Sequence, residues 1–280
     1  MIRIFAFILF SQQILLNAYP QNLNDKGYVS LSIGPSIPVG NYARTNLSND
    51  QAVFAALGGS AILSYSRLIG KKIGLAAELL GQINPLNVKA LEKDFGQQKF
   101  ALPSVILSNG PPQNLPHQVY VSYQNWGFDK KSWFSGSALV GGYGEFALSK
   151  AGNISVTTKV LLGAAYLSAP KLSGESHTDT SWIKVGQTAA SAFGFAYSLS
   201  SGLKYDFNKK ISLIAIIEYF GTSNVTFKNV TESLYSAYGE PNQFTLGGGI
   251  ANVSAQTSNT ANTSQKVSIL NISLGIGLRL

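Results

Sequence analysis

His177 stands in the stretch of the sequence that comes closest to a reactive combination. Its polar neighbours are Ser173, Glu175, Ser176 and Asp179. A histidine, an acid and a serine are the groups that an acyl-transfer or hydrolytic site needs. The sequence has no GxSxG elbow and no HExxH motif. We therefore interpret His177, and likewise His117, as a polar residue of a solvated loop, and we expect no catalytic site.

The composition argues against cofactor chemistry. The chain has two histidines and no cysteine, which predicts neither a thiolate nor a transition-metal site, and we expect no cofactor. The net charge of +8 arises largely from lysines in predicted turns, such as Lys71, Lys72, Lys209 and Lys210. These lysines form no basic stripe interleaved with aromatic residues, so we exclude nucleic acid as a partner and expect lipid phosphates beside them.

Six charged residues interrupt otherwise apolar segments at positions that share one face. They are Glu78, Glu145, Lys159, Lys204, Glu218 and Arg279. On a lipid-facing surface each charge would cost about 2–4 kcal/mol at mid-membrane, whereas inside a barrel the three acids and three bases can neutralise one another. We interpret them as a packed electrostatic network in a barrel interior. The alternative is the lining of a gated or selective pore.

The elements that would position these residues follow a period of two. Leu270, Ile272 and Leu274 alternate with Asn271 and Ser273, for example. The pattern predicts eight strands, at 27–36, 55–69, 71–84, 132–148, 153–168, 188–206, 210–226 and 266–280. Ile62 and Arg67 disturb the second of them. Most of the segments reach the about 9–11 residues that a tilted membrane strand needs.

The connections alternate between short and long. Tight turns follow the second, fourth and sixth strands, and the long connections are 37–54, 85–131, 169–187 and 227–265. Short periplasmic turns and long extracellular loops are typical of outer-membrane barrels. We therefore predict an all-β fold, a closed antiparallel up-and-down transmembrane β-barrel of about eight strands, in which the first strand pairs with the last.

Two alternatives to this topology stay open. Segments 98–107 and 117–128 can form an additional hairpin, which either enlarges the wall to ten strands or projects beyond the membrane. Pro103 weakens the first of these segments as a wall strand. A soluble secreted barrel is the other alternative.

The N-terminus predicts export. Arg3 precedes an apolar stretch, and Ala18 offers a cleavage site, so we expect a signal peptide at 1–18 and a barrel with four long extracellular loops at 19–280. The expected location is the outer membrane of a Gram-negative bacterium, reached through the periplasm. The expected partners are outer-membrane lipids and the barrel-insertion machinery, and we expect a monomer.

Aromatic residues gather near predicted strand ends, which favours two belts at the lipid headgroups. Tyr65, Phe146 and Tyr205 lie near short turns, and the residues near long connections are Trp133, Phe134, Tyr166, Phe193 and Tyr219. Trp126, Phe128 and Trp182 belong to the long connections or border them. They either pack within the loops or offer a surface for a sugar or a protein.

The opening Lys26–Gly40 and the ending Ile272–Leu280 resemble the outer membrane protein beta-barrel domain family, the OmpA- and OmpX-like barrels. The resemblance covers about 25–280 in pattern and implies the barrel fold without implying any catalytic residue. The leading hypothesis is a non-enzymatic barrel with a structural, adhesive or surface-interaction role, with a possible surface ligand bound by its loops. A narrow transport pore is the second hypothesis, and a lipid-modifying or protease-type barrel enzyme is the third.

Overall fold

A computed structural model of the chain describes residues 27–47, 52–101, 120–149, 152–178, 181–238 and 254–280. The predicted leader at 1–18 and His117 lie outside these residues. So do residues 102–119, which include the end of segment 98–107 and the start of segment 117–128. No helix within the described ranges has the length and hydropathy to cross a membrane.

Eight antiparallel strands close into a barrel, in the order β1-β15-β12-β11-β8-β7-β3-β2. Their bounds are β1 Tyr28–Pro38, β2 Gly58–Leu68, β3 Ile73–Pro85, β7 Ser132–Ala147, β8 Ile154–Ala169, β11 Ala190–Asp206, β12 Ile211–Thr222 and β15 Ser268–Arg279. The first and last strands pair, with Leu31 opposite Ile276. Each wall strand matches a predicted segment, so the eight-stranded topology is confirmed and the ten-stranded wall is wrong.

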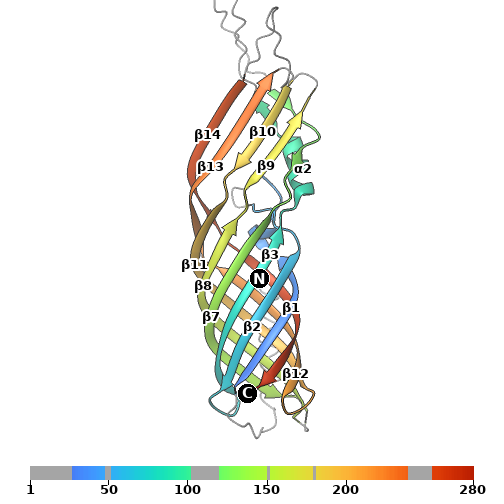
Figure 1. The fold of residues 1–280 in the computed structure, drawn as a ribbon, viewed down its shortest axis with the longest axis vertical. Helices are drawn as coiled ribbons and strands as arrows, with labels where there is room; N and C mark the ends of the chain where they lie inside the picture. The colour runs from blue at the N-terminus through green and yellow to red at the C-terminus, as the bar shows by residue number, and fades with distance from the viewer. Residues whose placement is uncertain (1–26, 48–51, 102–119, 150–151, 179–180, 239–253) are drawn as a thin grey trace, which may run out of the picture.

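Three short turns join wall strands at one end of the barrel (Figure 1). Ile69 and Gly70 both donate backbone hydrogen bonds to the Ile73 carbonyl oxygen in the first turn. Gly152 has a φ of +72° in the second, a conformation that glycine adopts without a Cβ clash. These tight links set the register of the hairpins β2–β3, β7–β8 and β11–β12.

The long connections contain a second sheet that the sequence did not predict. Its order is β14-β13-β10-β9-β6, and the bounds are β6 Gly127–Phe128, β9 Leu172–His177, β10 Ser181–Gln187, β13 Val225–Tyr238 and β14 Ser254–Gln265. Along the sequence these five strands are neighbours of the wall strands β15, β12, β11, β8 and β7, respectively. The five wall strands follow one another in the same order in the barrel. The second sheet therefore continues five strands of the wall beyond the barrel mouth, as Figure 1 shows.

A short helix and a hairpin accompany this sheet. Helix α2, Val88–Gln97, begins where the Asn87 side chain accepts a hydrogen bond from the Ala90 amide at 3.2 Å. Strands β4, Lys99–Ala101, and β5, Tyr120–Ser122, pair with each other and not with the wall. This pairing accounts for the extra hairpin of the sequence analysis, which lies outside the barrel wall. A single 3-10 turn, η2 at Gly40–Ala43, follows β1.

The second sheet and its covering segment have their own core. Phe54, Leu91, Tyr123, Trp126, Phe128, Ile183 and Val185 are buried together there. Trp126 contacts Phe95 and Phe128, with ring centroids 5.0 Å from Phe95 and 5.7 Å from Phe128. The described parts of the connection between β3 and β7, 86–101 and 120–131, therefore fold against the inner face of the sheet.

Candidate functional site in the barrel interior

Strand alternation turns the predicted charged residues toward the barrel axis. Glu78, Glu145, Lys159, Lys204 and Glu218 are all buried. Arg279 is different, because it lies at the end of β15 and 33% of its side chain is exposed. The second strand, which the sequence predicted only weakly, alternates without a break: Ile62 is buried and Arg67 faces outward near the end of β2.

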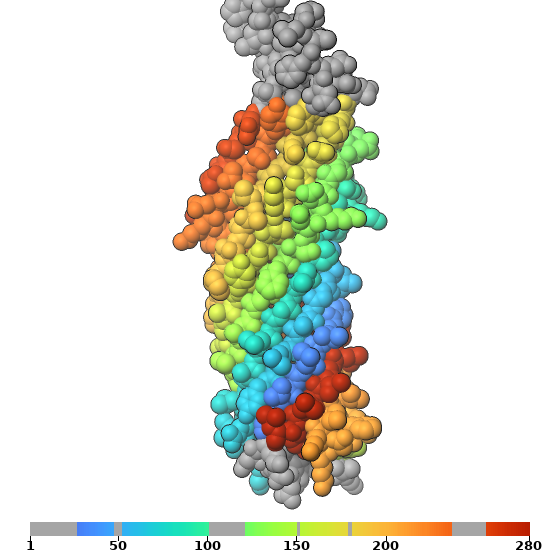
Figure 2. Space-filling view, viewed as in Figure 1, coloured from blue at the N-terminus to red at the C-terminus, as the bar shows by residue number. Residues whose placement is uncertain are grey.

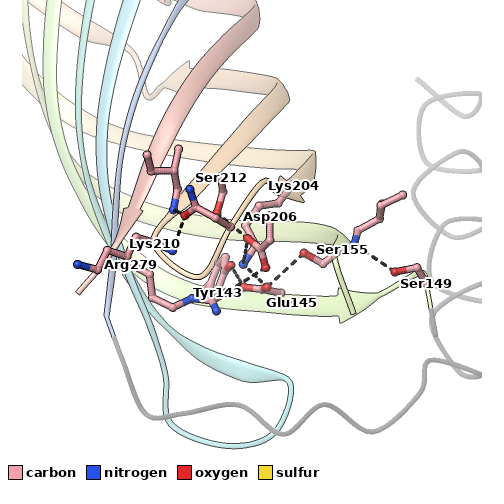
Figure 3. Close-up of polar contacts among 12 residues, drawn as sticks. Tyr143, Glu145, Ser149, Ser155, Lys204, Asp206, Lys210, Ser212 and Arg279 are labelled. Carbon is pink, nitrogen blue, oxygen red and sulfur yellow. Dashed lines mark hydrogen bonds and ion pairs between the residues drawn. The ribbon is translucent and has the colours of Figure 1, made fainter. Parts of the chain in front are cut away.

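Four charged residues form a cluster near the short turns, which we call the turn-end cluster: Glu145, Lys204, Asp206 and Arg279. Lys204 pairs with Glu145 and lies 3.8 Å from the Asp206 carboxylate. Arg279 donates to Asp206 at 2.9 Å. Figure 3 shows these groups converging inside the wall, with Tyr143 and Ser155 beside Glu145. Two acids and two bases balance each other in this cluster.

Asp206 is not among the six inward charges predicted from the sequence, although it ends the predicted strand 188–206. It is the last residue of β11, and its side chain also accepts a hydrogen bond from Ser212 at 2.5 Å. The sequence contains the pattern that predicts its inward direction, because Asp206 follows Lys204 by two residues and therefore shares its face of the strand.

The mid-barrel cluster consists of Glu78, Lys159, Glu218, Gln82 and Asn271. Lys159 Nζ lies 2.7 Å from Glu78 Oε2 and donates to Ser64 at 2.8 Å. Glu218 accepts a hydrogen bond from Asn271 at 3.2 Å, and Gln82 in turn donates to Asn271 at 3.0 Å. The network thus joins β2, β3, β8, β12 and β15 across the interior.

Charge in the mid-barrel cluster is not balanced. Glu218 lies against Glu78 and interacts with it electrostatically, but Lys159 forms its ion pair with Glu78. Apart from the contact that the two carboxyl groups make with each other, Glu78 Oε1 and Glu218 Oε1 are buried and have no hydrogen-bond partner within the described part of the chain. Two carboxyl groups that share a buried site repel each other when both are ionised, and Lys159 pairs with Glu78, so Glu218 is the electrostatically strained member of the network.

An apolar layer closes the interior toward the second sheet. Trp133 packs edge-on against Tyr42 and Phe227, at centroid distances of 5.9 and 6.1 Å. Trp133 is therefore buried inside the mouth, which corrects its predicted place in a headgroup belt. Burial raises the pKa of the Tyr42 phenol well above its usual range, which keeps the group neutral.

The polar residues around His177 do not assemble into a hydrolytic site. His177 is exposed on β9, while Ser176 faces the opposite side and donates to the Gln124 carbonyl oxygen. Ser173 shares the face of His177 but is four residues away, about 13 Å along a strand. Asp179 lies outside the described residues. The described ranges also contain no group of three or more His, Cys, Asp or Glu side chains suited to a metal.

The three loop aromatics separate into two kinds. Trp126 and Phe128 are buried in the core of the second sheet. Trp182 is half-buried and lies 4.7 Å from the Tyr235 ring. Trp182 pairs with His177 across the strands, so the two residues share the outer face of the sheet.

The outer surface of the barrel has the opposite character to its interior. Large apolar side chains are exposed on all eight wall strands, among them Ile33, Leu63, Leu75, Val140, Val160, Phe193, Ile217 and Leu274. A wall with buried ion pairs and an exposed apolar surface fits a lipid environment and not water. The chain is an eight-stranded transmembrane β-barrel. Its architecture is that of an outer-membrane protein, and Figure 2 shows its oblique strands forming one elongated body.

Comparisons with known proteins give matches of low similarity. No family model and no curated protein matches the sequence. The fold is similar to Ail, the attachment invasion locus protein of Yersinia pestis, with 11% identity over 92% of this chain and 100% of Ail and a TM-score of 0.40. Neisserial surface protein A has 11% identity over 91% of this chain and 97% of its own chain, with a TM-score of 0.39. A major outer membrane protein from Thermus thermophilus has 10% identity over 91% of this chain and 98% of its own chain, with a TM-score of 0.38.

Proposed function

We propose that this chain is a surface-interaction protein of the outer membrane, whose barrel anchors an extracellular sheet for adhesion. The observation that carries the proposal is the continuation of five wall strands into the second sheet. Only two or three residues separate each of these strands from its wall strand, so the barrel limits the movement of the sheet beyond the membrane. Simple connecting loops need no such sheet and no buried aromatic core.

The second sheet offers surfaces suited to contact. Its outer face carries the aromatic pair of Trp182 and Tyr235, with Lys184 and Glu175 beside it. Aromatic residues are enriched where proteins bind one another. The edge strand β14 is exposed from Gln256 to Asn262, and its twelve residues include no charged side chain.

The same architecture supports the expected partners. The apolar wall fits outer-membrane lipids, and the closed strand order leaves no free edge within the wall, which favours a monomer. Export by the leader at 1–18 and insertion by the barrel-insertion machinery complete the proposal.

A non-enzymatic role is part of the proposal. It is supported by the positions of Ser176 and His177 on opposite faces of β9. The charged groups of the interior are engaged with one another below an apolar layer, which favours a structural task for them.

A narrow pore is the second candidate, and one observation favours it. Several inner-wall serine hydroxyls have no protein partner within the described residues, among them those of Ser32, Ser66, Ser137 and Ser273. Buried hydroxyls of this kind are usually satisfied by water. The turn-end cluster, the mid-barrel cluster and the apolar layer nevertheless all cross the interior, which favours a barrel that does not conduct.

The test removes four of the five strands of the second sheet, β9, β10, β13 and β14, and keeps the wall. In the shortened variant, short turns join Ala169 to Ala190 and Gly221 to Ser268, the positions where wall strands still pair. We expect it to insert and to show heat-modifiable migration like the full chain. Bacteria that display it should adhere to epithelial monolayers no better than cells with an empty vector, while the full chain adheres.

A matched control keeps the sheet and changes only its surface. The double variant Trp182→Ala/Tyr235→Ala should reduce adherence, and Thr231→Ala/Thr260→Ala, also on exposed sheet positions, should reduce it less. Equal adherence of the shortened variant and the full chain, at equal surface amounts, would contradict the proposal.

A further inference from the structure

A half-open cavity lies where the barrel mouth meets the second sheet. Its volume is about 120 Å³. Trp133 and Phe227 belong to the layer that closes the barrel, while Val230 and Gln265 come from β13 and β14. Phe54 and Leu91 contribute from the first long connection and from helix α2. Segments far apart in the sequence therefore enclose one space outside the interior charge clusters.

The lining selects for an uncharged ligand. Among the described residues that line the cavity, none is charged and most have aliphatic or aromatic side chains. Moving an ion into such surroundings would be costly. The volume is close to that of the dry cavity of about 150 Å³ that holds benzene in another protein. The space therefore suits one small ring or a short chain.

Two lining residues carry buried polar atoms that have no hydrogen-bond partner among the described residues. Trp133, which is 9% exposed, has an unpaired indole Nε1–H, and Gln265 has an unpaired Oε1. Both residues line the cavity together with Phe227. The Trp133 ring centroid lies 6.1 Å from that of Phe227. Gln265, on β14, is the strand partner of Val225, which precedes Phe227 by two residues on β13. The first atom needs an acceptor and the second needs a donor.

We propose that this mouth cavity binds a small neutral aromatic alcohol of the phenol class. A hydroxyl group both accepts and donates, so it meets the needs of Trp133 Nε1 and Gln265 Oε1 together. The ring would lie against the Phe54 and Phe227 side chains. The inference goes beyond surface adhesion, because it assigns a small-molecule site to the junction of the barrel and the sheet.

The test titrates phenol into the full chain, labelled with ¹⁵N and held in lipid nanodiscs. The chain has three tryptophans, so three indole N–H signals report separately. We expect the Trp133 signal to shift saturably, with the Trp126 and Trp182 signals nearly unchanged. Benzene, which lacks the hydroxyl group and therefore both hydrogen bonds, should bind about 30-fold more weakly, the factor that two hydrogen bonds typically provide.

Three variants locate the site. Gln265→Leu keeps the size of the side chain and removes the acceptor, so it should weaken phenol binding about fivefold, to an affinity between those of phenol and benzene for the unchanged chain, because Trp133 still donates. Val230→Phe fills the cavity and should abolish the saturable shift. Trp133→Phe removes the donor and should weaken phenol binding, measured by saturation-transfer difference, whereas Trp182→Phe on the outer face should leave it unchanged. Heat-modifiable migration shows that each variant is folded.

Several results would overturn the proposal. These are a linear, unsaturable shift of all three indole signals, which indicates phenol dissolved in the bilayer, and equal affinities for phenol and benzene. Unchanged phenol binding in folded Gln265→Leu and Val230→Phe would also place the ligand elsewhere.

Discussion

Glu218 and Lys159 show how a single inward residue acts on the barrel. Both are buried at mid-barrel, but Lys159 is paired at 2.7 Å with Glu78, whereas Glu218 has an amide donor and no ion pair among the described residues. Their inward direction could be predicted from the sequence, because charge on the lipid face is costly. The imbalance could not be predicted, since it depends on which strands meet across the interior.

Replacing Lys159 should destabilise the barrel strongly. Lys159→Met leaves the Glu78 carboxylate buried without its cation, and breaking a buried pair typically costs about 3–5 kcal/mol. The measurement is urea unfolding in lipid vesicles, followed by tryptophan fluorescence. Lys130→Met, at an exposed lysine outside the wall, is the matched control and should change the unfolding free energy little. Equal effects of the two changes would rule out the buried pair as a stabilising contact.

Neutralising Glu218 should not destabilise the barrel, in contrast to replacing Lys159. Gln in place of Glu218 still accepts the hydrogen bond from Asn271 and removes a charge that Glu78 repels. We expect Glu218→Gln to leave the unfolding free energy unchanged or to raise it by up to about 2 kcal/mol. The same urea titration measures it. A loss comparable to that of Lys159→Met would show that the Glu218 charge is needed.

At the scale of elements, the eight wall strands were predictable and the second sheet was not. One face of each wall strand meets lipid and the other meets the interior, so the period of two is visible in residues such as Leu213 and Ile217. Strand β14, Ser254–Gln265, meets water on both faces between Gln256 and Asn262 and therefore shows no hydrophobic period.

Helix α2 was missed although the sequence contained its signals. Asn87 is a favoured N-cap residue, and Val88, Leu91 and Phe95 follow at helical spacing. The polar residues around them obscured the pattern. Among the candidate site residues, the five buried charges were placed correctly by alternation alone, whereas the grouping into two clusters required the closed strand order.

Trp126 should hold the second sheet together without supporting the wall. Its ring contacts four other aromatic rings, including those of Phe95 and Phe128. Trp126→Ala removes these contacts, and large-to-small changes of this kind cost about 3–5 kcal/mol. We expect faster hydrogen exchange in β6, β9 and β10, with exchange in β8 and β11 unchanged. Equal acceleration in the wall strands would show that the two parts unfold as one unit.

At the scale of the whole molecule, the barrel should act as an anchor and not as a channel. The two charge clusters and the layer of Tyr42, Trp133 and Phe227 cross the interior at different heights. We expect the purified full chain to give no steady conductance in a planar bilayer. A stable conductance that changes in Lys159→Met would instead favour the pore.

The central claim is that the apolar face of the wall meets lipid while the polar face is enclosed. Because the natural chain has no cysteine, single cysteines carrying spin labels can be placed one at a time along β12 in lipid vesicles. Labels at Leu213 and Ile217 should collide often with oxygen and rarely with a water-soluble nickel chelate, and a label at Ser212 should be shielded from both. If the nickel chelate reached Leu213 and Ile217 as readily as a label at the exposed Thr260, the account would be contradicted.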